Sequence, residues 1–187
     1  TAKINISVGG YCSGATLPTL TIFEKANIPM LIPAANSADL LKGSLKNVFL
    51  INGTGIQQAQ AAADFIKAEG SKAVALVDDN TSYSKDITTR AAENLKTAGV
   101  TVANQQSVTA GESDYSGAVT AITRANSDFV YWTGNYQKGG LLIKQLRAAG
   151  YTGKIMVADG SVDKQLVDIA GEANAQGVVA TMTQTPS

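Results

Sequence analysis

The sequence contains no histidine and a single cysteine, Cys12. The absence of histidine excludes Ser-His-Asp and Cys-His catalysis, and it excludes zinc sites that contain histidine. One cysteine forms neither an internal disulfide nor a thiolate cluster. Catalysis by carboxylates, lysine or tyrosine stays open, but the sequence carries no motif for it.

Other signals are missing as well. No apolar run is long enough to span a membrane, and no signal sequence is recognised in these residues. The 15 Lys and Arg residues are scattered and are balanced by 15 Asp and Glu, so no basic cluster points to nucleic acid. There is no G-x-G-x-x-G after a strand, no P-loop and no G-x-S-x-G elbow. We therefore expect no cofactor, no metal and no nucleic-acid partner.

What is present is ordinary globular composition. The 187 residues are 44% hydrophobic and 16% charged, enough for one domain or for one and a part. Runs with strand character alternate with amphipathic runs along almost the whole chain. This predicts an α/β fold with parallel sheets and helices on both faces. We expect strands over residues 4–8, 29–32, 47–51, 73–77, 100–108, 128–132, 154–158 and 177–182, and helices over 15–26, 55–69, 83–98, 115–125, 138–149 and 163–170, with a helical turn over 38–42.

Two features of the apolar runs and their ends refine this prediction. Residues 73–77 form an apolar run without alternation, which is typical of a strand covered on both faces. Gly70 and Gly99 follow amphipathic runs, where glycine commonly ends a helix.

Polar and small residues follow several predicted strands. Ligands of open parallel sheets bind beyond the carboxyl ends of the strands, so these residues are candidates for one site. Serine, asparagine and free backbone amides suit a carboxylate, an aspartate suits an ammonium group, and tyrosines supply a wall and hydroxyls. The set therefore predicts recognition of a zwitterion such as the head of an amino acid. Its members are Cys12, Ser13 and Gly14, then Ala34, Ala35 and Asn36, then Asp78, Asp79 and Tyr83, then Asn135 and Tyr136, and finally Asp159.

Each of these residues also has a purely structural interpretation. Ser13 and Thr16 are good candidates for helix caps. Asp159 and the other strand-end aspartates fit solvated turns, and the tyrosines fit half-buried packing. Trp132 is expected in the core, and Cys12 is either a small buried residue or half of a disulfide without its partner. The weight lies in the shared location at strand ends.

Four segments are similar to a known family. Residues 10–16 (GYCSGAT), 33–37 (PAANS), 109–116 (TAGESDYS) and 128–131 (DFVY) resemble the branched-chain amino-acid-binding proteins of bacterial ABC transporters. The likeness runs in register from about Ile4 to the end of the sequence. It implies a type I periplasmic solute-binding protein, in which two α/β lobes close over an amino acid.

The resemblance also implies roles for individual residues. Ser13 would bind the ligand carboxylate and Ala34 would offer backbone groups. Asn36 stands where leucine-binding proteins usually have threonine, so its role departs from the family pattern. Tyr83 would face the ligand, and Asp159 falls where the family has an acidic residue, commonly glutamate, for the ligand amine.

Two further positions are less regular under the resemblance. A family tyrosine aligns with Asn135, next to Tyr136. Cys12 matches a family cysteine that is bonded to an earlier cysteine absent from this sequence.

Members of that family are roughly twice this length, so the resemblance implies a partial chain. Residues 1–53 would belong to lobe 1, residues 54–182 to lobe 2, and residues 183–187 would begin the return to lobe 1. The implied partners are a small amino acid of the leucine, isoleucine or valine kind and a membrane permease. The intact protein would be a monomer in the periplasm, or lipid-anchored at the cell surface. The alternative is a ligand-sensing domain of the same fold on a receptor or regulator, whereas an α/β enzyme is disfavoured by the missing motifs.

Overall fold

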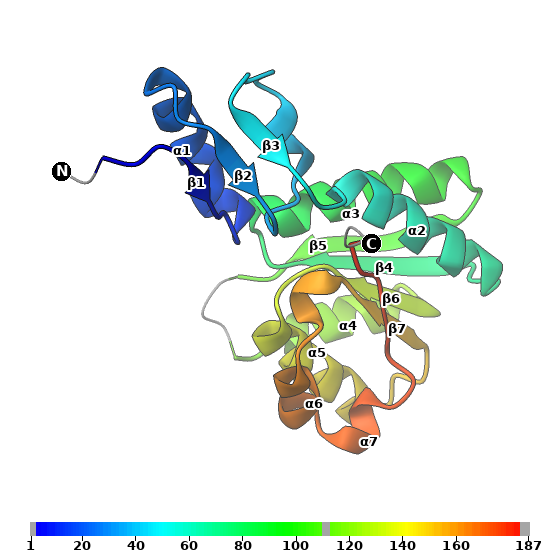
Figure 1. The fold of residues 1–187 in the computed structure, drawn as a ribbon. Helices are drawn as coiled ribbons and strands as arrows, with labels where there is room; N and C mark the ends of the chain where they lie inside the picture. Colours follow the sequence, from blue (N-terminus) through cyan, green and yellow to red (C-terminus); the bar gives the residue numbers. More distant parts are fainter. Residues whose placement is uncertain (1–2, 110–112, 184–187) are drawn as a thin grey trace.

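The computed structural model describes residues 3–109 and 113–183, and these residues form two parallel sheets (Figure 1). In the three-stranded sheet the order is β1 (Ser7–Val8), β2 (Met30–Ile32) and β3 (Val48–Leu50). In the five-stranded sheet the order is β5 (Thr101–Ser107), β4 (Ala73–Asp78), β6 (Phe129–Trp132), β7 (Lys154–Val157) and β8 (Val179–Ala180). The predicted α/β fold with parallel strands is confirmed.

Helices connect the strands as the alternation predicts. They are α1 (Ser13–Lys25), α2 (Gly55–Ala68), α3 (Ser82–Thr97), α4 (Ser116–Arg124), α5 (Tyr136–Ala148), α6 (Lys164–Ala170) and α7 (Glu172–Ala175), with 3₁₀ turns η1 (Ala38–Leu41) and η2 (Asp159–Ser161). The short elements α7 and η2 are not predicted from the sequence. β1 and β8 are shorter than expected, with two residues each. Part of the TAGESDYS segment, residues 110–112, lies outside the described residues.

Both faces of the five-stranded sheet are buried. On β6, Val130 and Trp132 face a core with α4, α5 and α6, while Phe129 and Tyr131 face a second core with α2 and α3. Residues 74–77 of β4 are fully buried, because their side chains alternate between these two cores. The run without alternation and the core position of Trp132 are therefore confirmed.

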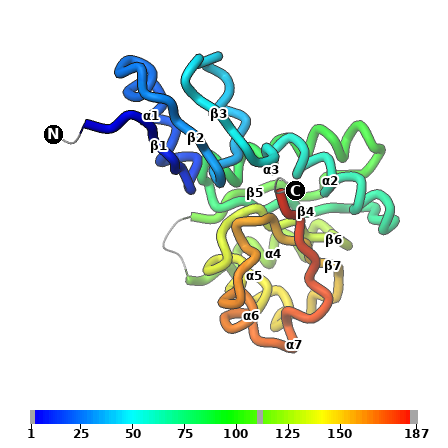
Figure 2. Tube along the Cα trace, viewed as in Figure 1, coloured from blue at the N-terminus to red at the C-terminus, as the bar shows by residue number. Residues whose placement is uncertain are grey.

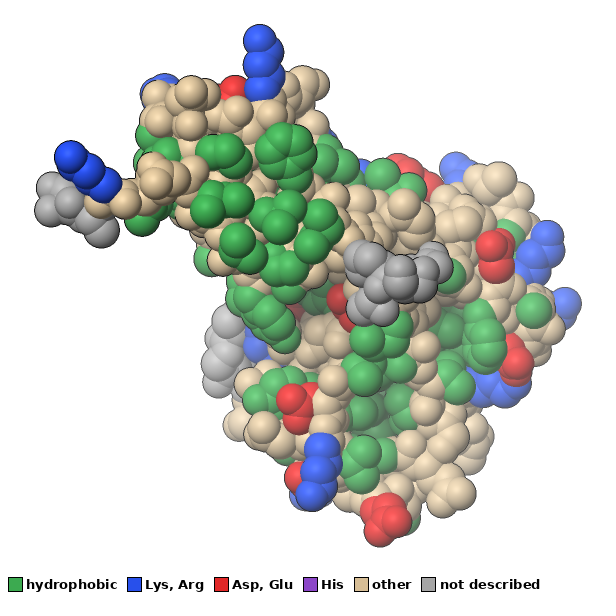
Figure 3. Space-filling view, in the orientation of Figure 1, with side chains coloured by type: hydrophobic (Ala, Val, Ile, Leu, Met, Phe, Trp, Pro, Cys, Tyr) green, Lys and Arg blue, Asp and Glu red, His purple; other side chains and the backbone are tan. Residues whose placement is uncertain are grey.

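The three-stranded sheet is covered differently. Leu20 of α1 packs with Met30 and Ile32 of β2 on one face. On the other face Val8 and Phe49, in register with each other through β2, are 66% and 51% exposed. Hydrophobic side chains gather over this sheet in Figure 3. Among the described residues, helices thus cover both faces of the larger sheet and one face of the smaller sheet.

Local signals explain where the helices begin and end. The Gln57 side chain accepts a hydrogen bond of 2.8 Å from the Thr54 backbone N–H, which completes a capping box at the start of α2. Gly70 and Gly99 follow α2 and α3 with φ of 74° and 77°. This left-handed conformation strains residues with a side chain, so the predicted helix ends at both glycines are confirmed.

The topology brings the strand ends together. β4 and β6 are neighbours, but the chain leaves β4 for β5 on one side and leaves β6 for β7 on the other. Such a reversal opens a crevice at the carboxyl ends of the two strands. The trace in Figure 2 shows the segment after β8 returning from the five-stranded sheet toward the three-stranded one. Loops from both sheets therefore meet at one place.

Candidate functional site

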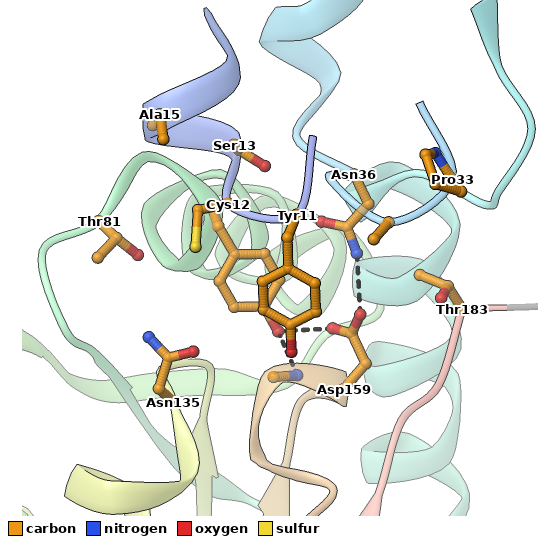
Figure 4. A pocket seen from close by; sticks show the side chains of 14 residues that line it. Tyr11, Cys12, Ser13, Ala15, Pro33, Asn36, Thr81, Asn135, Asp159 and Thr183 are labelled. Atoms are coloured by element: carbon orange, nitrogen blue, oxygen red, sulfur yellow. Dashed lines mark hydrogen bonds between the residues drawn. The ribbon is translucent and has the colours of Figure 1, made fainter. Parts of the chain in front are cut away.

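A cavity of about 390 Å³ lies where the carboxyl ends of the two sheets face each other (Figure 4). Its size is typical of a site for a small molecule. The loops and helix that follow β1 and β2 supply one wall, and the segments after β4, β6, β7 and β8 supply the other. The lining residues are Tyr11, Cys12, Ser13, Gly14, Ala15, Pro33, Ala34 and Asn36 on the first wall, and Thr81, Tyr83, Asn135, Asp159, Gly160 and Thr183 on the second.

Most of the residues predicted for the site lie together in this lining. Four do not belong to it, namely Ala35, Asp78, Asp79 and Tyr136. Ala35 is buried, and its N–H donates to the Gly10 carbonyl over 2.8 Å, which ties the loops after β1 and β2 together. Tyr136 begins α5 and packs half-buried against the core below the five-stranded sheet. The predicted residues in the lining are Cys12, Ser13, Gly14, Ala34, Asn36, Tyr83, Asn135 and Asp159.

Asp159 is the one charged residue in the described lining, and both of its oxygens are engaged. Oδ1 accepts a hydrogen bond of 2.5 Å from the Tyr83 hydroxyl, and Oδ2 accepts one of 3.1 Å from Asn36 Nδ2 (Figure 4). The Tyr83 oxygen in turn accepts from the Gly160 N–H over 2.9 Å. Burial, together with the nearby Asp159 charge, raises the pKa of Tyr83, so its hydroxyl stays protonated and donates to the carboxylate.

Ser13 is the first residue of α1 and is only 1% exposed. Its hydroxyl oxygen accepts from the Ser37 N–H over 3.2 Å, and a hydroxyl that accepts one bond still has its hydrogen to donate. The N-cap of α1 is Cys12, without a side-chain capping bond, and the Thr16 hydroxyl donates to the Cys12 carbonyl. The capping interpretation of Ser13 and Thr16 is therefore wrong, because the helix starts one residue earlier than a Ser13 cap requires.

Asp79 follows β4 and lies outside the cavity lining, where it contacts two lining residues, Thr81 and Asn135. Its buried carboxylate accepts from the Thr81 hydroxyl over 2.7 Å and from Asn135 Nδ2 over 3.2 Å, and it lies 3.5 Å from Lys138 Nζ. Burial alone would raise the pKa of Asp79, but the hydrogen bonds from Thr81 and Ser84 and the charge of Lys138 together lower it. Asp79 thus remains charged and positions two lining residues, a role that the solvated-turn interpretation does not give it.

Several lining residues were not singled out in the sequence. Tyr11 is 79% exposed at the cavity and belongs to the GYCSGAT segment, but the sequence assigns it no role of its own. Thr81 is the N-cap of α3, a pattern that is recognisable once that helix is placed. Thr183 comes from the segment after β8, which no local pattern connects to this site.

Cys12 is exposed and free, so its interpretation as a small buried residue is wrong.

The described part of the chain contains no group of three or more His, Cys, Asp or Glu residues placed to hold a metal ion. Within the same residues, no helix has the length and apolar character needed to cross a membrane.

The fold places a cavity of the size of a small-molecule site between two parallel sheets. Residues 1–187 match the family of periplasmic binding proteins, and the chain belongs to that family.

Named relatives and solved structures agree with this assignment. The Leu/Ile/Val/Thr-binding protein of Salmonella typhimurium is 32% identical over 179 residues, which cover 95% of this chain and 49% of the relative. A leucine binding protein from Thermotoga maritima superposes with a TM-score of 0.80 at 27% identity over 89% of this chain and 48% of that one. A branched-chain amino acid transporter substrate binding protein from Streptococcus pneumoniae, in complex with isoleucine, has a TM-score of 0.84 at 25% identity over 94% of this chain and 50% of that one. The chain spans about half the length of these relatives.

Proposed function

We propose that this chain is part of the solute-binding component of an ABC importer and binds a small amino acid of the leucine, isoleucine or valine kind. In this proposal residues 1–53 belong to lobe 1 and residues 54–182 to lobe 2, and residues 183–187, of which 184–187 lie outside the described residues, begin the return to lobe 1. Closure of the lobes over the ligand in the periplasm would present the complex to a membrane permease.

The polarity of the cavity carries this proposal. Asp159 supplies a carboxylate on one wall, and the described lining has no lysine or arginine. Ser13 and the first turn of α1 supply hydroxyl and N–H donors on the other wall. A ligand with an ammonium group near Asp159 and a carboxylate near Ser13 satisfies both walls. A simple anion would meet Asp159 without a compensating cation.

The comparisons support the same ligand class. The names of the relatives give leucine, isoleucine and valine among their ligands, and they name binding proteins rather than enzymes. The cavity offers apolar lining beside the polar head-group contacts, including Ala15, Pro33 and Ala34. A short aliphatic side chain fits such a surface.

Calorimetric titration of the chain with L-leucine, L-isoleucine, L-valine and L-alanine tests this function. We expect saturable binding of one or more of them to the wild type. Asp159→Asn should weaken that binding by about 2–5 kcal/mol, because the buried ammonium group loses its charged partner. Asp168→Asn, a matched change at an exposed carboxylate of α6, should leave it unchanged. Unaltered affinity in Asp159→Asn would remove Asp159 from the site, and no binding of any amino acid would contradict the function.

A further inference from the structure

A buried line of polar side chains connects the cavity to the segment that leaves β8. Asn36, Gln58 and Thr181 are 1%, 2% and 8% exposed and come from the loop after β2, from α2 and from the residue after β8. Gln58 Nε2 lies 3.0 Å from Thr181 Oγ1 and 3.3 Å from the Thr181 carbonyl. Gln58 Oε1 lies 3.5 Å from Asn36 Nδ2, which is also 3.1 Å from Asp159 Oδ2. Three separate segments thus meet in one hydrogen-bonded line.

The Thr181 end of this line fixes the orientation of the Gln58 amide. A backbone carbonyl only accepts hydrogen bonds, so the nitrogen of Gln58 must face Thr181. The Thr181 hydroxyl lies 3.4 Å from the Val157 carbonyl and 3.0 Å from the Tyr131 hydroxyl, and its oxygen accepts from Gln58 whichever of the two takes its hydrogen. With its nitrogen held there, Gln58 turns its oxygen toward Asn36.

The Asp159 end independently requires the same orientation of the Asn36 amide. A carboxylate accepts hydrogen bonds, so Asn36 must turn its nitrogen toward Asp159. The two hydrogens of that nitrogen then serve Asp159 Oδ2 and Gln58 Oε1. Acceptor groups at both ends of the line therefore set both amides, and neither amide is free to flip.

The consequence lies at Asn36 Oδ1. This buried oxygen has no hydrogen-bond partner among the described residues, although Asn36 lines the cavity. Figure 4 shows it turned away from Asp159, toward the side of the cavity where Tyr11 lies. A buried acceptor without a partner is unfavourable, and a ligand that brings an N–H to it removes the deficit.

We propose that Gln58 is a positioning residue that holds Asn36 Oδ1 toward the ligand as an acceptor, so that the site selects ligands with a hydrogen-bond donor at the α-carbon. This inference rests on the proposed function and extends it to Asn36 and Gln58. Without the Gln58 contact only the hydrogen bond to Asp159 orients the Asn36 amide, so the amide turns more readily and then presents its N–H₂ group to an acceptor. Selection for an amine over a carbonyl at the same place is therefore the property that Gln58 strengthens.

The test compares L-leucine with its α-keto acid, which has the same carbon skeleton and a carbonyl in place of the ammonium group. Titrations use the wild type, Gln58→Met, which keeps length without polar atoms, and Thr181→Val, which keeps the backbone carbonyl that orients Gln58. We expect the wild type to prefer leucine, Gln58→Met to lose about tenfold or more of that preference, and Thr181→Val to keep it. If Gln58 had a purely structural role, Gln58→Met would weaken the binding of both ligands equally and leave the ratio of their Kd values unchanged.

A second measurement needs no variant and no ligand. In the ¹⁵N-labelled wild type, deuterium exchange of the side-chain amide hydrogens of Asn36 and Gln58 should be slow. Fast exchange, or an unchanged preference in a folded Gln58→Met protein, overturns the inference and leaves the proposed function standing. A wild type that binds no amino acid overturns both the proposed function and the ligand selection. Slow exchange in that case would still show that the Asn36 and Gln58 side-chain amides are hydrogen-bonded.

Discussion

At the scale of single residues, Asp79 illustrates how a buried charge supports a candidate site without lining the cavity itself. Its carboxylate gathers the Thr81 hydroxyl, the Asn135 amide and the Lys138 ammonium group behind the lining. Each of these partners donates, so only a charged acceptor satisfies all of them. Hydrogen bonds to the Asp79 carboxylate and the charge of Lys138 also lower the pKa of Asp79.

Asp79→Asn should lower the free energy of unfolding by about 1–3 kcal/mol at neutral pH, because an amide places an N–H₂ group against donors. A carboxyl whose folded-state pKa lies below its usual 3.8 stabilises the fold above that pH and loses its contribution as the pH falls below it. The gap between wild type and Asp79→Asn should therefore narrow as the pH falls below 3.8. Urea unfolding at several pH values measures both effects.

The control for this experiment is Asp168→Asn, which changes an exposed carboxylate on α6 and should follow the wild type throughout. Equal stability of wild type and Asp79→Asn at neutral pH would contradict the supporting role of Asp79. A gap that widens on acidification would contradict the direction of its pKa shift.

At the scale of elements, α3 of the five-stranded sheet contacts η1, which lies between β2 and β3 of the three-stranded sheet. Asp86 on α3 accepts from the Ala38 N–H of η1 over 2.9 Å, and Arg90 holds its other oxygen over 2.8 Å. A Cβ on Gly55, the first residue of α2, would come within 2.7 Å of Asp86 Oδ2. The absence of a side chain at Gly55 therefore allows η1, α2 and α3 to meet at one carboxylate.

Gly55→Ala should destabilise the protein by about 1–3 kcal/mol, because the added methyl group displaces the Asp86 carboxylate from Ala38. Gly117→Ala is the matched control, since Gly117 lies in α4 and a Cβ there meets nothing within 4 Å. That change should stabilise the protein by up to about 1 kcal/mol through helix propensity. Thermal unfolding of the two variants compares them directly, and a stabilising Gly55→Ala would show that Asp86 yields without cost.

The elements also show what the sequence could and could not predict. Apolar runs such as residues 73–77 and glycines such as Gly70 are local signals, so the strand, helix and parallel-sheet content could be predicted from them. Asp159 and Ser13 could be placed at strand ends, because carboxyl ends of parallel strands share an edge. The Asn36–Gln58–Thr181 line could not be predicted, because it depends on how two sheets and the segment after β8 meet. The position of Tyr136 in a core rather than at the cavity depends on the same tertiary detail.

At the scale of the whole molecule, the two sheets differ in how far helices cover their faces. The five-stranded sheet has helices on both faces, whereas one face of the three-stranded sheet exposes Val8, Phe49 and Ile51 in the described chain. Parallel sheets are usually buried on both faces. The segments that follow the strands of both sheets nevertheless line the cavity, and their side chains define its polarity.

The central claim is that the cavity between the sheets binds the head group of a small amino acid. Titration of the ¹⁵N-labelled chain with L-leucine, followed by amide NMR, reads whether binding occurs and where. We predict saturable shifts centred on Ser13, Asn36, Tyr83 and Gly160, with Leu166 and its surroundings unaffected. Saturation with shifts confined to another region, or no shifts with leucine, isoleucine, valine or alanine, would contradict the claim.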